Sequence, residues 1–193
     1  MEELFLKHKE WLDSEGQSGA QLILENEDMK DVNIDGKLLH DAKFLECDFI
    51  RKCITKTDFD NSLMCSSMFI YSLIRECNFR KADLQYADFK NAQILNTSFA
   101  KTDLDEADFE NATLTNSKLI NACLYLTNFS NVRFKNIEFS GAMFEETVLS
   151  GSEFENIVGI DDATIKSINI GTVDNPNILV GEEAKNWIYN REI

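Results

Sequence analysis

Residues 81–125 read KADLQ YADFK NAQIL NTSFA KTDLD EADFE NATLT NSKLI NACLY, and each group of five has a large apolar residue in its fourth position. The same spacing extends outward in both directions, because every fifth residue from Leu24 to Phe154 is Leu, Ile, Met or Phe. Every Phe except Phe5 lies in this phase. A helix repeats every 3.6 residues and a strand every 2, so a period of five predicts a repeat architecture instead.

A second periodic position lies two residues before the large one and is mostly small. From Ala42 to Thr127 it holds Ala, Ser, Thr or Cys, with Lys52 as an exception. A backbone that turns a corner every five residues would form a four-sided coil, and each side would place one large and one small residue inside. The sequence therefore predicts a coil with a packed interior that leaves no pore.

The large inward residues are expected to stack from coil to coil as a core ladder. The members that we single out are Phe44, Phe49, Phe59, Phe69, Phe79, Leu84, Phe89, Phe99, Leu104, Phe109, Phe129, Phe134, Phe139, Phe144 and Phe154.

The five-residue units resemble the A(D/N)Lxx units of pentapeptide-repeat proteins, and the resemblance extends from residue 22 to about residue 171. It implies an all-β solenoid, a right-handed quadrilateral β-helix of about 7 coils. It implies little about activity, because the family includes DNA mimics that protect topoisomerases and many proteins without an assigned function.

The repeat divides the chain into a cap at 1–21, the β-helix at 22–171 and a C-terminal extension at 172–193, all within one structural domain. Residues 2–13 predict a helix whose apolar stripe contains Leu4, Phe5, His8, Trp11 and Leu12. The segment EEAKNWIYN predicts a second short helix carrying Trp187, which either covers the last coil or serves in a homodimer.

The repeat has two irregular regions. Glu27, Lys37 and Lys52 occupy the small position near the start, so the first coils are expected to be distorted, or these side chains to extend outward along their stems. A slip of one residue is expected after Ile157, with Val158 joining the inward phase.

Composition limits the function. The formal net charge is −15 and the pI is about 4.5, which argues against direct binding of nucleic acid or of an anionic membrane. No apolar stretch is long enough to span a bilayer, and the acidic N-terminus differs from a signal peptide. We therefore expect a cytoplasmic protein whose five cysteines are free thiols.

No pattern of a catalytic, metal or cofactor site occurs in the sequence. His8 and His40 have no partners at metal-ligand spacing. Acidic pairs such as Asp103 and Asp105 are expected on a convex surface without a pocket that would shift a pKa. We predict no enzyme and no cofactor; an active site would need a pocket supplied by the termini.

Outward positions assign charge to the four faces of the coil, which we name by one central residue each: the Leu84, Phe89, Ile74 and Phe79 faces. The Leu84 face has the largest net negative charge, the Phe89 face comes next, and the other two are balanced. The predicted acidic face comprises Asp83, Asp103, Asp105, Glu106, Asp108, Glu110, Glu145 and Glu146. It either serves function or keeps the rod soluble.

Large apolar residues also occupy outward positions in adjoining coils, and such a set marks a partner site. The predicted interface comprises Leu45, Ile50, Leu63, Met68, Ile70, Tyr71 and Leu73, together with Trp187. The alternative is that the N-terminal helix or the C-terminal segment folds back over these residues.

The sequence indicates two alternative functions. The first is a non-catalytic solenoid that presents an interaction surface to another protein, whose identity the sequence does not give. The second, suggested by the family resemblance, is an acidic DNA mimic that binds a type II topoisomerase. About 36 Å of duplex carries about 21 charges, more than the two acidic faces supply.

Overall fold

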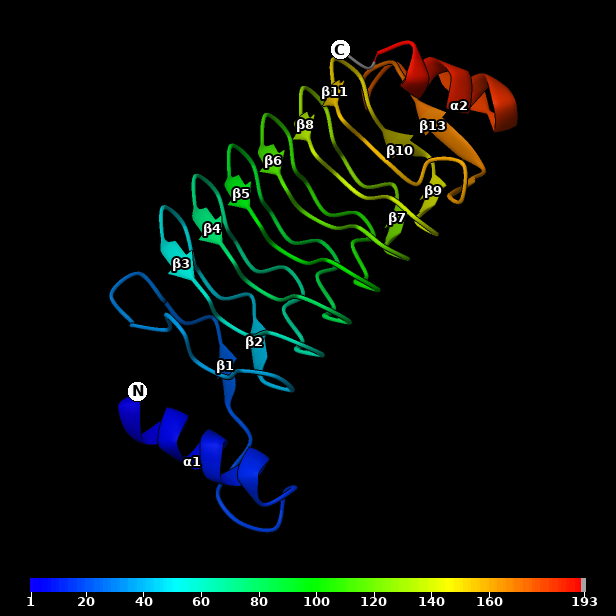
Figure 1. Ribbon diagram of the computed structural model, residues 1–193. Helices are drawn as coiled ribbons and strands as arrows, with labels where there is room; N and C mark the ends of the chain where they lie inside the picture. The colour runs from blue at the N-terminus through cyan, green and yellow to red at the C-terminus, as the bar shows by residue number, and fades with distance from the viewer. Residues whose placement is uncertain (192–193) are drawn as a thin grey trace.

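The computed structural model describes residues 1–191 and shows a β-solenoid of about 7 turns with a helix at each end (Figure 1). This confirms the predicted fold class. The helices are α1, Glu2–Asp13, and α2, Gly181–Tyr189. The strands are β1 Ile23–Glu25, β2 Lys43–Leu45, β3 Cys53–Thr55, β4 Leu73–Arg75, β5 Gln93–Leu95, β6 Thr113–Thr115, β7 Cys123–Tyr125, β8 Arg133–Lys135, β9 Met143–Glu145, β10 Thr147–Val148, β11 Glu153–Glu155, β12 Thr164–Ile165, β13 Ser167–Asn169 and β14 Ile178–Val180.

Successive coils pair in parallel, and each residue lies beside the residue twenty positions later. On the Ile74 face, β3, β4, β5, β6, β8 and β11 form one parallel sheet in which Ile54 pairs with Ile74 and Ile74 with Ile94. Between named strands the ladder continues through the large inward residues; for example, the Phe69 N–H donates to the Asp88 carbonyl at 2.6 Å. The backbone groups of each coil are thus satisfied by its neighbours.

The corners of the coil lie two residues after each large inward residue and adopt a left-handed conformation. Asn91 and Asn111 have φ values of 59° and 60°, a region that Asn tolerates better than most residues. Gly151 takes the same position, where an added Cβ would lie 2.2 Å from Asn131 Oδ1. Along a second corner, Asn116 Nδ2 donates to Asn96 Oδ1 at 3.1 Å.

Stacked aromatic rings fill the interior. On the Phe89 face, the ring centroids of Phe69 and Phe89 lie 4.6 Å apart and those of Phe89 and Phe109 lie 4.5 Å apart, with nearly parallel planes. Rings of opposite faces meet edge to face across the interior, as Phe89 and Phe99 do at 6.1 Å. Both arrangements suit the charge distribution of aromatic rings, so the coil has no open lumen at these layers.

The C-terminal coil departs from the regular register. Val158 still pairs with Glu138, twenty residues earlier, whereas Ile165 pairs with Phe144, twenty-one residues earlier. The extra residue therefore follows Val158, and the prediction that Val158 turns inward is wrong: its side chain is 59% exposed. Ile160 takes the inward place that Gly159 would have filled, because a residue without a side chain packs nothing.

A hairpin and a helix complete this end. Strand β14 pairs with β13 in the antiparallel sense, and α2 follows at once, burying Ala184 and Ile188. The domain boundaries after residues 21 and 171 stay predictions; both lie outside helices and strands, and residues 192 and 193 of the extension lie outside the described part.

The helix α1 closes the opposite end through a narrower contact than predicted. Only Phe5 and His8 of its predicted stripe are buried, while Leu4 is 42% exposed. The His8 ring makes two hydrogen bonds: the Leu22 N–H donates to Nδ1 at 3.1 Å, and Nε2 lies 3.1 Å from the His40 carbonyl oxygen. These contacts require the neutral ring with its proton on Nε2.

Candidate interaction surface

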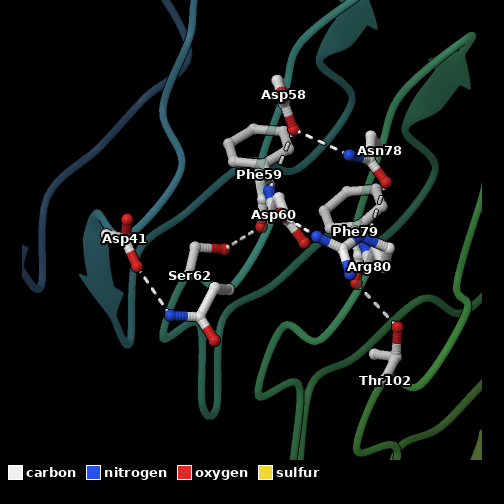
Figure 2. A network of polar contacts seen from close by, with 10 residues as sticks. Asp41, Asp58, Phe59, Asp60, Ser62, Asn78, Phe79, Arg80 and Thr102 are labelled. Atoms are coloured by element: carbon white, nitrogen blue, oxygen red, sulfur yellow. Dashed lines mark hydrogen bonds and ion pairs between the residues drawn. The ribbon is translucent and has the colours of Figure 1, made fainter. Parts of the chain in front are cut away.

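The predicted core ladder lies entirely inside the solenoid. Each of its named residues, from Phe44 to Phe154, is no more than 1% exposed. Small inward residues add hydrogen bonds that the sequence reading did not specify: the Thr102 hydroxyl donates to the Phe79 carbonyl at 2.7 Å, and Ser62 donates to the Phe59 carbonyl at 2.8 Å (Figure 2). Ser and Thr at the small position are the sequence feature that indicates these hydrogen bonds. Because the inward residues are buried, another molecule can contact only the outward ones.

Like charges are stacked at the centre of the Leu84 face. Asp83 and Asp103 pair directly across neighbouring coils, and Asp105 and Glu106 lie on the same coil as Asp103. We call these four residues the acidic column. Among residues 1–191, no Lys or Arg forms an ion pair with any of them.

Two titratable groups at the acidic column have raised pKa values. Partial burial raises the pKa of the Asp105 carboxyl, and the nearby charge of Asp103 raises it further. Asp103 accepts a hydrogen bond from Gln85 Nε2 at 2.7 Å. At the next corner, the negative charge of Glu106 raises the pKa of the Tyr86 hydroxyl. The column therefore carries negative charge that this chain leaves without a cation.

Asp103 and Asp105 also approach a thiol. Their oxygens and the Cys123 sulfur lie within 4.8 Å of one another, the one group of three potential metal ligands among the described residues. Burial, with the Asp105 hydrogen bond, raises the pKa of Cys123 to about 11. The thiol is thus protonated near neutral pH, whereas a thiolate is the form that binds metals. The group is a hydrogen-bonded cluster in this state.

The rest of the predicted acidic face is more nearly neutral. On the Phe89 face, Lys90 Nζ lies 3.2 Å from Asp88 Oδ2 and 2.7 Å from Asp108 Oδ2, while Glu110 lies on the next coil beside Asp108. Towards the C-terminus, Lys166 pairs with Glu145 at 2.6 Å. The corner residue Glu146, with a φ of 52°, is exposed. The predicted face thus divides into an unpaired centre and partly neutralised flanks.

The opposite faces stack charges of opposite sign. On the Phe79 face, Arg80 Nη2 pairs with Asp60 Oδ2 at 2.6 Å, and Asn78 Nδ2 donates to Asp58 Oδ1 at 2.8 Å (Figure 2). On the Ile74 face, Arg133 pairs with Glu153 at 3.0 Å and Lys135 with Glu155 at 2.6 Å. Charge alternation from coil to coil is therefore the rule on these faces, and the acidic column is the exception.

The predicted apolar residues Leu45, Ile50, Leu63, Met68, Ile70, Tyr71 and Leu73, which we call the apolar patch, wrap around three faces of the second and third coils. Tyr71 is 56% exposed and Leu63 is 37% exposed; the others are half-buried. In Figure 1, α1 lies beyond β1 and α2 beyond β13, so neither helix covers the patch.

Trp187 does not join the apolar patch. It lies on α2 at the far end of the solenoid, half-buried against the core, with the Arg191 guanidinium 4.9 Å from its ring centroid. The intervening coils separate it from the apolar patch, and its part in an interface stays a prediction.

One cavity was not anticipated. A pocket of about 250 Å³ lies between α1 and the first coil, lined in part by Phe5, Leu6, Lys37 and Leu38. Leu6 is 62% exposed and Leu38 is 55% exposed. Lys37 extends from the small position over the Phe5 ring, 4.6 Å from its centroid. The five-residue period carries no signal for this pocket, since α1 lies outside the repeat.

The family model for pentapeptide repeats matches residues 69–99, 92–131 and 124–157, with 8 copies of the repeat. Residues 69–157 of this chain are thus pentapeptide repeats. No curated protein matches the sequence. Within the described residues, neither helix is long and apolar enough to cross a lipid bilayer.

Several solved structures are similar to the chain. A trypsin-treated variant of QnrB1, a plasmid-mediated fluoroquinolone resistance protein, is 22% identical, with a TM-score of 0.46 over 75% of this chain and 77% of that one. Rfr23 from the cyanobacterium Cyanothece 51142 is 20% identical, with a TM-score of 0.42 over 72% and 84%. HetL from Nostoc sp. strain PCC 7120, involved in heterocyst differentiation regulation, is 16% identical, with a TM-score of 0.30 over 86% and 94%.

Proposed function

We propose that this chain is a non-catalytic protein that binds another protein on the outer surface of its solenoid. The observation that carries the proposal is the apolar patch, which lies outside the core and which neither helix covers. Outward apolar side chains that adjoin one another across coils gain free energy when a partner removes them from water. The folded interior has no space for a ligand at the stacked layers, so the outer surface is the available binding region.

Two substitutions in the apolar patch test this function. Ile70→Asp with Leu73→Asp should abolish association with the partner, or self-association, and leave the circular dichroism spectrum unchanged. Thr113→Asp with Thr115→Asp is the matched control, because both residues also point outward from the solenoid. Pull-down from the native host and light scattering measure the outcome; equal association by all three proteins would reject the proposal.

A second candidate is an acidic DNA mimic that binds a type II topoisomerase. This candidate requires that the chain and the topoisomerase share a compartment, and the cytoplasmic location that we expect for the chain is the one proposed. The acidic column favours it, because stacked carboxylates without cations imitate a run of phosphates. The short length of the acidic column weighs against this candidate: the next coil replaces Asp103 and Asp105 with Cys123 and Tyr125, and Lys90 partly neutralises the adjoining face.

A supercoiling assay tests the mimic directly. Inhibition or protection of a type II topoisomerase is expected at micromolar protein. Reversing the charges of Asp103, Asp105, Glu106, Asp108 and Glu110 should weaken it. No effect of the unmodified protein at high micromolar concentration would exclude this candidate.

A further inference from the structure

We propose that the partner docks through a segment that carries aliphatic side chains next to Lys or Arg residues, and that this segment lies along the corner between the Leu84 and Phe89 faces. The inference rests on the proposed function and adds the chemistry of the partner. The aliphatic side chains would contact the apolar patch, and the basic ones would contact the acidic column.

The two parts of this surface meet at the same coil step on both faces. On the Leu84 face, Leu63 pairs directly with Asp83 of the next coil. On the Phe89 face, Met68 pairs directly with Asp88 of that same coil. The surface therefore changes from apolar to acidic along one line across the corner, and Tyr86, 54% exposed, lies on the acidic side of it.

The acidic half is complementary to a cation that the chain itself does not provide. Asp83, Asp103 and Asp105 lack ion pairs within the described region, whereas outward acids at the same places on the Ile74 face, Glu153 and Glu155, each have one. Like charges on adjacent strands repel. A basic group of the partner would relieve this repulsion, so charge complementarity favours a basic segment over an acidic or neutral one.

Lys90 limits where the basic residues can bind. It already lies between Asp88 and Asp108 on the Phe89 face. The larger uncompensated charge is therefore on the Leu84 side of the corner, and the basic side chains are expected there. The aliphatic side chains are expected beside Leu63 and Met68, which flank this corner one coil before Asp83 and Asp88.

The coil spacing sets the spacing within the partner. Leu63 and Asp103 lie two coils apart, which is about 10 Å at about 4.8 Å per layer. An extended segment covers this distance in about three residues, and a helix covers it in about two turns. The aliphatic and basic groups of the partner segment should have this separation.

Three synthetic peptides provide the probe. The first joins an aliphatic block to a lysine block through three small residues, Ile-Ile-Leu-Gly-Ser-Gly-Lys-Lys-Lys-Lys; the second replaces the lysines by Ser, and the third replaces the aliphatic residues by Ser. Fluorescence anisotropy with the full chain measures binding. The joined peptide should bind at least about tenfold tighter than either other peptide, and its affinity should fall as salt rises.

Paired variants locate the contacts. Asp103→Asn with Asp105→Asn should weaken the joined peptide about tenfold, whereas Glu153→Gln with Glu155→Gln, at the same two outward places on the Ile74 face, should change its affinity less than twofold. Leu63→Asp with Met68→Asp, at the apolar side of this corner, should also weaken it. Equal loss from both carboxyl pairs would indicate attraction by overall charge and overturn the inference.

The outcomes separate this inference from the proposed function. If the aliphatic peptide binds as tightly as the joined one, and only Leu63→Asp with Met68→Asp abolishes binding, the basic partner is excluded while the apolar docking function stands. Binding of the lysine peptide alone, without dependence on the apolar patch, overturns the inference too. If no peptide binds, the inference fails, and the pull-down with the apolar variant still decides the proposed function.

Discussion

The middle coils and the first coil have the same length and similar inward residues, yet different interactions hold them in place. Phe89, in the middle, lies between Phe69 and Phe109, 4.6 and 4.5 Å away. Met29 of the first coil lies inside as well, but this coil has a neighbouring coil on one side only. The same stacking contact, repeated from coil to coil, therefore suffices to hold the middle coils. The first coil needs additional contacts that are not part of the repeat.

Those single contacts come from three polar side chains. The buried His8 ring binds backbone groups at the beginning and the end of the first coil. Gln21 Nε2 donates to the Asp41 carbonyl at 2.6 Å, and Lys52 Nζ donates to the Val32 carbonyl at 2.7 Å. Each side chain satisfies a backbone carbonyl or N–H of the first coil, and Lys52 does so from the second coil. The capped end thus depends on specific polar residues, and the middle depends on apolar packing.

Removing one ring should have the largest effect. Phe89→Ala removes a fully buried side chain from the stack, so the free energy of unfolding should fall by about 3 to 5 kcal/mol. Chemical denaturation measures the change. Tyr86→Ala, an exposed residue nearby, is the control and should change stability by no more than about 0.5 kcal/mol. A loss below about 1 kcal/mol for Phe89→Ala would contradict its place in the ladder.

The cap should be the next most sensitive region. His8→Ala leaves the Leu22 N–H and the His40 carbonyl without their partner, which should cost about 1 to 3 kcal/mol. Hydrogen exchange should locate the loss at the Leu22 amide, with the amides of the middle coils remaining protected. Lys7→Ala, on the exposed side of α1, serves as the control. Uniform loss of protection along the rod would show that the two regions are not independent.

Mild acidification should weaken the cap through His8. Burial lowers the pKa of His8 below its ordinary value of 6.5, although Asp41 and the His40 carbonyl oppose this shift. The unfolded chain therefore binds a proton more readily, and stability should be complete above pH 6.5 and fall as the pH is lowered below it. Thermal unfolding measures the trend. His8→Gln should remove this part of the pH dependence; an unchanged slope would refute the assignment.

The smallest effect concerns the acidic column. Asp105→Asn removes a carboxylate whose pKa is raised by partial burial and by the neighbouring charge of Asp103, so it should increase the free energy of unfolding by about 0.5 kcal/mol. Glu153→Gln breaks the pair with Arg133 and should lower it by a similar amount. Denaturation at low salt compares the two. If both variants were destabilised, the exterior of the middle coils would not differ between faces.

The period of five predicted the middle of the fold because one residue type decides each position locally. It predicted neither the role of His8 nor the place of the slip. His8 acts on backbone groups of residues 22 and 40, and such contacts leave no period. Because Val158 is apolar, the pattern of apolar residues predicts it inward. The backbone pairing of Val158 with Glu138 sets the register instead, and a pattern of apolar residues carries no information on that pairing.

The sequence also predicted which residues would point outward, but it did not predict how their charges would be paired. Asp103 and Asp108 are equivalent in the repeat, and each is contacted by the residue eighteen positions earlier: Gln85 donates to Asp103, whereas Lys90 pairs with Asp108. The five-residue pattern gave no reason to look at this diagonal contact between coils, although the residues that make it are in the sequence. The path of the chain that carries Trp187 beyond the last coil follows no repeat, so the pattern did not specify its contacts either.

The antiparallel pairing of β14 with β13 controls growth of the rod. Each coil offers its successor a parallel edge, and a second molecule added end to end would need the same kind of edge. The final strand runs in the opposite direction, so it presents hydrogen-bonding groups in a pattern that an incoming first coil does not match. The last hairpin therefore disfavours end-to-end stacking of molecules into fibres. Each molecule keeps the fixed length of its own coils, although a parallel coil edge could in principle be extended without limit.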